Sequence, residues 1–159
     1  MNIQLNIQSR EVLVALQSTL ALIKPHVCKQ GLKSVIKIIN RYVNPQDGLK
    51  IHEIRYFIMS EDLFEKIYGQ HEGKWFYQAM HDCYVGGGFI ALWLDGENAV
   101  AKVREINGPT DPADAKIKAP DSLRALYGTG TKAPTNAVHG SDSGKSAFYE
   151  LQMIFANPL

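Results

Sequence analysis

Apolar residues recur along this chain with two different spacings, and the alternation between the two limits the folds that it can adopt. Three short apolar stretches, "STLALIKP", "LKIHEIRYFIM" and "GGGFIALWL", predict strands, the second of them with one irregularity. Between the first two, the apolar residues of positions 32–43 recur every three or four residues, which is typical of an amphipathic helix. Strands and helices that alternate in this way predict a mixed domain, of the α/β or the α+β kind.

Caps and apolar spacing predict the remaining helices. Ser60 suits a helix N-cap, and a helix to about Tyr68 follows it. Further helical stretches lie near residues 73–85, 97–106 and 143–155. The order that results, β-α-β-α-α-β-α-loop-(β)-α, predicts an α/β sandwich in which helices pack on a mainly antiparallel sheet.

Length and composition fit one intracellular domain. A chain of 159 residues can build one compact core, and we expect residues 1–17 to form an N-terminal extension of a domain that spans residues 18–159. No apolar run approaches the ~18–20 residues that a membrane crossing needs, and the N-terminus does not resemble a secretory signal. We therefore expect an intracellular protein without a membrane partner; a cytoplasmic location is favoured and a mitochondrial one stays open.

Charge excludes a general affinity for nucleic acid and points to a local anion site. The formal net charge is +1, so we expect no specific nucleic-acid partner. Lys24 ends the first predicted strand, while Arg104, Thr110 and Arg124 lie in or beside residues 107–135. That stretch is rich in Pro, Gly, Asp and Thr and shows little periodicity, which predicts a long functional loop. Arginine forks suit phosphate oxygens.

The segment "NAVHGSDSGKS", residues 136–146, allows two interpretations that both involve phosphate. A P-loop would cradle a phosphate with the pattern G-x-x-x-x-G-K-[ST] between a strand and a helix. Only three residues separate Gly140 from Gly144, so the ring of backbone N–H groups is one residue short. We therefore interpret Gly144, Lys145 and Ser146 as the first turn of a solvated helix.

The second interpretation assigns the phosphate to His139 itself. Asp142 or Ser143 suits the N-cap of the following helix. If that helix starts at Ser143, Ala147, Glu150 and Ile154 lie on one face of it. Glu150 then shares an inward face with apolar residues, and a buried carboxylate needs a partner. His139, which lies just before the N-terminus of the same helix, is the obvious partner. A carboxylate bound to one ring nitrogen fixes the tautomer and leaves the other nitrogen free to attack.

Several motifs together resemble one known family. They are "TLALIKP", "HEGKWFY", "GENAVAKVREINGPTDPADA", "APDSLR" and, most specifically, "NAVHGSDS". The chain is similar to the nucleoside diphosphate kinases over about residues 18–155. "HEGKWFY", "GPT" and "APDSLR" resemble the divergent type 6 branch of that family most.

The resemblance implies a fold, an activity and a set of site residues. The fold would be a ferredoxin-like αβ sandwich around a four-stranded antiparallel sheet. The activity would be ping-pong transfer of the γ-phosphate from a nucleoside triphosphate to a nucleoside diphosphate, with Mg²⁺ on the phosphates and no metal ligand from the protein. The implied catalytic residues are His139 as phosphorylated nucleophile, Glu150 and Ser141 as its supports, and Tyr68 near the γ-phosphate. The implied nucleotide-binding residues are Lys24, Phe76, Arg104, Thr110, Arg124 and Asn136.

The resemblance also leaves a second function open and implies an assembly. Where the family commonly has an acid after "KP", this chain has His26, and Ala125 and Leu126 replace a Gly-Asp pair. These changes keep open an alternative function, that of a divergent nucleotide-binding member with weak or no kinase activity that acts as a scaffold or regulatory protein. Family likeness and the wide apolar stripe of residues 32–43 predict a homo-oligomer, whether dimer, tetramer or hexamer.

Overall fold

The computed structural model describes residues 16–130 and 134–156. The predicted N-terminal extension therefore lies almost entirely outside the described residues. Its last two positions, Leu16 and Gln17, already belong to the first strand, which begins two residues before the expected domain start. The expectation that residues 1–17 form a separate segment remains a prediction.

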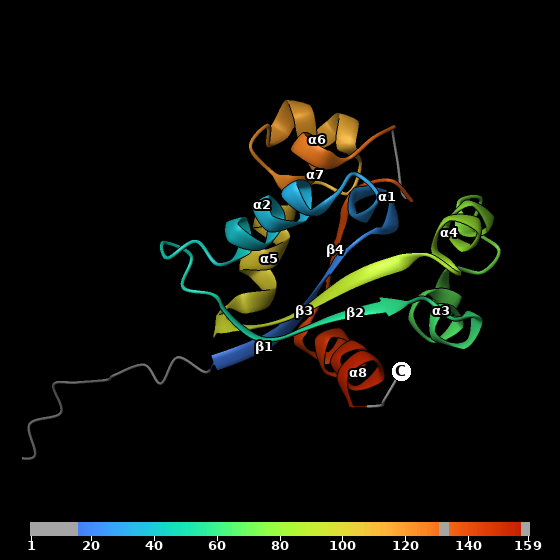
Figure 1. Cartoon of the computed structure of the whole chain (residues 1–159), viewed down its shortest axis with the longest axis horizontal. Coiled ribbons are helices and arrows are strands. Elements are labelled where there is room, and N and C mark those ends of the chain that lie inside the picture. Colours follow the sequence, from blue (N-terminus) through green and yellow to red (C-terminus); the bar gives the residue numbers. More distant parts are fainter. Residues whose placement is uncertain (1–15, 131–133, 157–159) are drawn as a thin grey trace, which may run out of the picture.

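A four-stranded antiparallel sheet lies at the centre of the molecule (Figure 1). Its strands, in the spatial order β2-β3-β1-β4, are β1 (Leu16–Ile23), β2 (Lys50–Ile58), β3 (Gly88–Glu97) and β4 (Val138–Gly140). All three strand pairs are antiparallel, and β2 carries a register shift between Ile51 and Glu53, the irregularity that its sequence predicted. The predicted α+β class and the four-stranded antiparallel sheet are both confirmed.

Eight α-helices and one short 3-10 helix are present in the described residues. They are α1 (Pro25–Cys28), α2 (Leu32–Tyr42), α3 (Glu61–Tyr68), η1 (Gly69–His71), α4 (Tyr77–Tyr84), α5 (Ala99–Asn107), α6 (Pro112–Lys118), α7 (Leu123–Tyr127) and α8 (Gly144–Phe155). Two predicted caps are present, since the Ser60 hydroxyl accepts from the Leu63 amide and the Ser143 hydroxyl accepts from the Ser146 amide.

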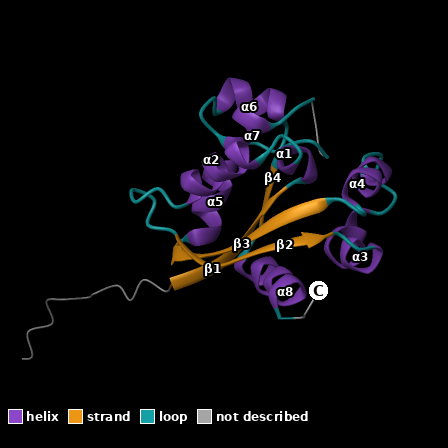
Figure 2. Cartoon of the chain, viewed as in Figure 1, coloured by secondary structure: helices purple, strands orange, loops and turns teal. Residues whose placement is uncertain are grey.

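The helices cover both faces of the sheet because successive side chains of a strand point to opposite sides. Leu20 and Leu22 of β1 pack on one side against α3, α4 and α8. Ala21 and Ile23 of the same strand pack on the other side against α1, α2, α5 and α7. Figure 2 shows α8 on one side of the strands, with α2 and α5 on the other.

One sequence expectation about the fold was wrong. The stretch 107–135 was expected to be a loop, yet it contains α6 and α7. Asp111 caps α6 and Pro112 occupies its first turn, a start signal that is independent of periodicity. Helices of seven and five residues are too short to display an apolar repeat. The apolar stripe of α2 is as wide as the sequence indicated, and one chain covers only part of it, because Leu32 and Ile36 are exposed.

Candidate active site

One cleft gathers almost every residue that the sequence singled out. Its volume is about 680 Å³, within the range of small-molecule sites. The predicted residues that line it are Lys24, Tyr68, Phe76, Arg104, Thr110, Arg124, Asn136, His139 and Glu150. Ser141 lies behind this wall and reaches the site through Glu150. These lining residues come from β4, from the four helices α3, α5, α7 and α8, and from the segments between elements that hold Lys24, Phe76, Thr110 and Asn136.

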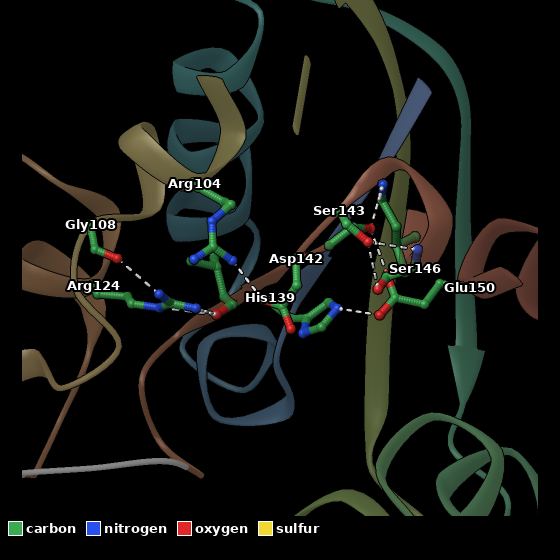
Figure 3. A network of polar contacts seen from close by, with 11 residues as sticks. Arg104, Gly108, Arg124, His139, Asp142, Ser143, Ser146 and Glu150 are labelled. Atoms are coloured by element: carbon green, nitrogen blue, oxygen red, sulfur yellow. Dashed lines mark hydrogen bonds and ion pairs between the residues drawn. The ribbon is translucent and has the colours of Figure 1, made fainter. Parts of the chain in front are cut away.

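His139 is held at the centre of β4, where its backbone pairs with Leu22 of β1. Its Nε2 lies 3.1 Å from Oε1 of Glu150, the contact that helix spacing predicted (Figure 3). A carboxylate can only accept, so Nε2 carries the proton in this contact. The other ring nitrogen, Nδ1, then keeps its lone pair and is the nucleophilic atom.

Ser141 and Glu150 form the support behind the imidazole. The hydroxyl of Ser141 donates to Oε2 of Glu150 at 2.5 Å and accepts from the backbone N–H of Leu20 at 3.3 Å. Both carboxylate oxygens of Glu150 are therefore occupied, one by Ser141 and one by His139. A carboxylate with both oxygens hydrogen-bonded cannot rotate freely. This chain of contacts therefore sets the orientation of the His139 ring.

The chain turns sharply just before His139. Ala137 is fully buried and adopts a left-handed backbone at φ 71°, and the Val138 amide donates to the Asn136 carbonyl at 2.9 Å. This is a γ-turn of the rare, strained kind. Such a turn costs of the order of 1–3 kcal/mol. The Lys24 amide stabilises it by donating to the Ala137 carbonyl at 3.0 Å. The turn sends Asn136 and His139 into the same cleft.

Gly140 has two roles in the site. It lines the cleft, where its missing side chain leaves room for a ligand. A Cβ atom at this position would also lie 2.8 Å from Nδ2 of Asn107 and 2.9 Å from Cγ1 of Val103. Close packing of α5 against β4 therefore requires glycine here.

Three cationic side chains face the cleft with very different surroundings. Lys24 is only 5% exposed, and its pKa lies well below the usual lysine value because burial removes solvent and because Arg124 is near. Burial also lowers the pKa of Arg124. Arg104 is exposed and pairs with Asp142 at 2.5 Å (Figure 3). A buried lysine and a partly buried arginine that repel each other are unfavourable without an anion, so the pair favours a phosphate in the cleft.

Arg124 was expected to lie in a loop with its guanidinium free for phosphate. It lies in α7 and already donates to the backbone, at 2.8 Å to the Gly108 carbonyl and 3.1 Å to the Val138 carbonyl. A third, longer bond joins Nε to Val138 at 3.4 Å. A guanidinium has five N–H donors, so two remain for a ligand. Arg124 thus serves the fold and the cleft together.

The other predicted nucleotide contacts also lie in the cleft. Asn136 is buried, and its Nδ2 donates to the Thr110 carbonyl at 2.9 Å. The Phe76 ring lies at the α4 side, with the His71 ring edge-on at a centroid separation of 5.6 Å. Tyr68 lies 6.1 Å from the His139 ring, and its buried hydroxyl has no hydrogen-bond partner in the described structure. Burial raises the pKa of Tyr68, so the hydroxyl stays protonated and can donate to a phosphate.

The comparison with known proteins decides the family. The family model for nucleoside diphosphate kinase matches residues 17–158. This chain belongs to the nucleoside diphosphate kinase family. A nucleoside diphosphate kinase of Aquifex aeolicus is 36% identical over 143 residues, which cover 90% of this chain and 96% of that protein. One of Streptomyces avermitilis is 37% identical over 139 residues, with 87% and 96% covered.

Solved structures agree with the sequence relatives. The structure of the Aquifex aeolicus nucleoside diphosphate kinase superimposes with a TM-score of 0.80 at 35% identity, over 89% of this chain and 96% of that chain. The apo enzyme of Encephalitozoon cuniculi gives a TM-score of 0.78 at 25% identity, over 90% and 93%. The assignment to the type 6 branch is not resolved by these matches and stays a prediction.

The donors in the cleft fit a metal ion that arrives with a nucleotide better than a resident one. Within the described residues, no group of three or more His, Cys, Asp or Glu side chains is placed to hold a metal. Two carboxylates line the cleft apart from Glu150, but Asp111 caps α6 and Asp142 pairs with Arg104. Mg²⁺ is usually held by phosphate oxygens, water and one or two carboxylates. Asp111 and Asp142 are the two carboxylates that the cleft could offer for this purpose.

Sequence reasoning missed two residues of the site. His71 lines the cleft, where burial and the neighbouring Lys74 lower its pKa. Tyr84 at the end of α4 bonds to Lys24. His71 opens the motif "HEGKWFY", which is the signal that could have found it, whereas Tyr84 lies on an apolar helix face, where a tyrosine is usually a core residue. Among the described residues, no helix has the length and apolar character needed to span a membrane; the expected location remains a sequence prediction.

Proposed function

We propose that this chain is an active nucleoside diphosphate kinase in which His139 carries the phosphate between two nucleotides. The observation that carries the proposal is the contact chain from Ser141 through Glu150 to Nε2 of His139, which leaves Nδ1 free in a cleft lined by cations. The same arrangement argues against a member that has lost its activity. A scaffold would have no need for a largely covered carboxylate that is fixed at both oxygens behind a histidine.

In the first half-reaction, the lone pair on Nδ1 attacks the γ-phosphorus of a nucleoside triphosphate. The bond from that phosphorus to the oxygen between the β- and γ-phosphates breaks, and the nucleoside diphosphate leaves with the bonding electrons. In the second half-reaction, an oxygen on the terminal phosphate of another nucleoside diphosphate attacks the same phosphorus and frees Nδ1. Glu150 stabilises the imidazolium character that develops on the ring.

The other cleft residues would bind and orient the nucleotide. Catalysis of phosphoryl transfer is mostly positioning and neutralisation of charge. We assign the phosphates to Arg104, Thr110 and Arg124, and the sugar to Asn136 and Lys24, with Lys24 also meeting phosphate. Tyr68 would donate to the γ-phosphate. Phe76 would stack on the base, and because every base has a π-face, we expect broad base tolerance.

Mg²⁺ is proposed to enter with the nucleotide. Bound to phosphate oxygens, it would neutralise part of the charge that builds up during transfer. Asp111 and Asp142 are the carboxylates nearest to that role, because both line the cleft. Asp142 would first have to exchange its partner Arg104.

The proposed activity predicts transfer between nucleotides with different bases. We expect ATP and CDP, mixed with the protein and Mg²⁺, to yield ADP and CTP, because the γ-phosphate passes through His139. Separation of the four nucleotides by ion-exchange chromatography measures this directly. Removal of Mg²⁺ with EDTA should reduce the rate by more than tenfold, since several kcal/mol of charge stabilisation is lost. Absence of CTP with Mg²⁺ present would contradict the proposal.

We also propose that two copies of the chain associate through the edge strand β2. Ile54, Tyr56 and Ile58 are about half exposed or more, at 47%, 63% and 53%. Ile54 and Tyr56 pair with Leu92 and Ile90 of β3, residues of the sheet face on which α2 packs. The exposed apolar residues Leu32 and Ile36 belong to α2 itself. An unpaired strand edge is a template for pairing with another chain, and an exposed apolar patch marks an interaction site.

The dimer can be tested by mass and by one substitution. Light scattering at micromolar concentration should give at least twice the chain mass of 17.7 kDa, with a tetramer or hexamer as larger options. Tyr56→Glu should shift the protein toward the monomer, because it introduces a charge into the covered face. Tyr149→Glu is the matched control, since Tyr149 is an exposed aromatic residue on α8, across the sheet. A monomeric mass for the unmodified protein would refute the proposal.

A further inference from the structure

The hydroxyl of Tyr84 lies against the ammonium group of Lys24. Tyr84 is 1% exposed and is the last residue of α4. Nζ of Lys24 donates to this hydroxyl at 2.6 Å, and the hydroxyl donates onward to the Pro134 carbonyl at 3.0 Å. These contacts join positions that are 60 and 50 residues apart in the sequence. The reaction described above assigns no role to Tyr84.

The contacts of Lys24 leave one donor for a ligand. An ammonium group has three N–H donors. Tyr84 takes one, and Oδ1 of Asn136 takes another at 2.5 Å. Because two acceptors in fixed positions define the orientation of the group, the third N–H has one direction left. Lys24 lines the cleft, so that direction is available to a phosphate or sugar oxygen.

The surroundings of the pair favour a neutral tyrosine and make the charge on Lys24 depend on its acceptors. Burial raises the pKa of Tyr84 well above that of a free phenol, so its oxygen stays a neutral acceptor. Burial acts on Lys24 in the opposite sense and lowers its pKa. A hydrogen bond to the charged form opposes that effect. Loss of the hydroxyl would therefore weaken the charged state of Lys24.

Tyr84 also fixes the segment that leads to the nucleophile. Pro134 lies two residues before Asn136, whose Nδ2 bonds to the Thr110 carbonyl. The Tyr84 hydroxyl thus joins the end of α4, the end of β1 and the approach to β4. Its ring is packed independently of the hydroxyl, at centroid distances of 5.3 Å from Tyr68 and 5.4 Å from Phe89.

We propose that Tyr84 is a positioning residue for phosphoryl transfer, whose hydroxyl holds the Lys24 ammonium charged and directed at the phosphates of the bound nucleotide. The inference rests on the proposed function. It goes beyond that function because it assigns the effectiveness of Lys24 to a residue that touches neither nucleotide nor nucleophile.

The test compares Tyr84→Phe with Tyr77→Phe in single-turnover phosphorylation of the protein by ATP. Both substitutions remove one hydroxyl from α4, but the Tyr77 hydroxyl bonds to Glu65, and neither residue lines the cleft. Tyr84→Phe should slow phosphorylation roughly tenfold or more, the scale expected for a hydrogen bond to a charged group. The alkaline limb of its pH–rate profile, where Lys24 loses its proton, should also move to lower pH. Tyr77→Phe should match the unmodified protein in both respects.

A double-mutant cycle separates this role from a general loss of structure. In a Lys24→Met background, Tyr84→Phe should change the rate less than twofold, because its effect acts through Lys24. An equal loss in both backgrounds, or an unshifted alkaline limb, would overturn the inference and indicate a merely structural residue. Normal kinetics in folded Tyr84→Phe would overturn it too while leaving the proposed function intact. If the unmodified protein takes no phosphate from ATP, both the inference and the proposed function fail.

Discussion

Replacement of His139 by alanine is expected to abolish both phosphorylation of the protein and transfer between nucleotides. Nδ1 of His139 is the free nitrogen in the cleft, and Glu150 and Ser141 support the ring from behind. Loss of a covalent nucleophile costs on the order of a million-fold in rate. The fold should survive, since the ring is partly exposed in the cleft and the β4 backbone keeps its pairing with β1.

The measurement uses radiolabelled ATP with no second nucleotide present. The unmodified protein should retain the label as a phosphoramidate, which is lost in acid and survives alkali, whereas His139→Ala should retain none. Glu150→Gln should reduce labelling without abolishing it, because the amide changes the orientation and tautomer of the ring but leaves the nucleophile.

Lys145→Ala is the control that decides between the two interpretations of "NAVHGSDSGKS". Lys145 is exposed in the first turn of α8 and does not line the cleft. Its loss should change activity little, as for an ordinary surface substitution. A P-loop protein would behave in the opposite way. Activity that survives His139→Ala and disappears in Lys145→Ala would overturn the phosphohistidine mechanism.

Replacement of Arg124 by alanine should damage transfer and stability together. Two N–H donors of Arg124 remain for a phosphate, and loss of such a charge-assisted contact costs ~1.5–3 kcal/mol, or about one to two decades in kcat/KM. The substitution also removes the donors to the carbonyls of Gly108 and Val138. Polar groups left without partners cost about 1–3 kcal/mol of unfolding free energy. A loop residue without such contacts would have changed stability by only roughly 0.5 kcal/mol.

Urea unfolding and steady-state kinetics on the same preparation separate these two effects. Arg124→Lys is the comparison, since lysine keeps the charge but cannot form the fork. We expect it to recover part of the phosphate binding and little of the stability. Unchanged kinetics in a destabilised Arg124→Ala protein would mean that the guanidinium serves only the fold. Unchanged stability would mean that water replaces its contacts to the two carbonyls.

Local sequence patterns predicted the features that depend on neighbours in the chain. The spacing of Ala147, Glu150 and Ile154 placed a carboxylate on the inward face of α8, and Ser143 fixed where that helix begins. These two facts suffice to bring Glu150 to His139, because only eleven residues separate them. The bulge in β2 and the cap at Ser60 were predictable in the same way.

Features that depend on partners distant in the chain were not predictable from patterns. Helix α2 shows a continuous apolar stripe, but the sequence cannot tell which part is covered by the sheet; Leu32 and Ile36 remain exposed. Arg124 appeared free because its acceptors are carbonyls of other segments. Backbone acceptors leave no signature in the sequence, since every residue carries one.

The sequence by itself determined the family and the order of the four strands and of the longer helices, and it predicted His139 as nucleophile with Glu150 as its partner. Each of these depends on residue type and short spacing, which the covalent chain fixes. Only the tertiary structure decided how Lys24 is held between Tyr84 and Asn136, how Arg124 divides its donors, and which apolar side chains stay uncovered. The physical reason is that hydrogen-bond geometry and burial arise when distant segments meet, and no local pattern records where they meet.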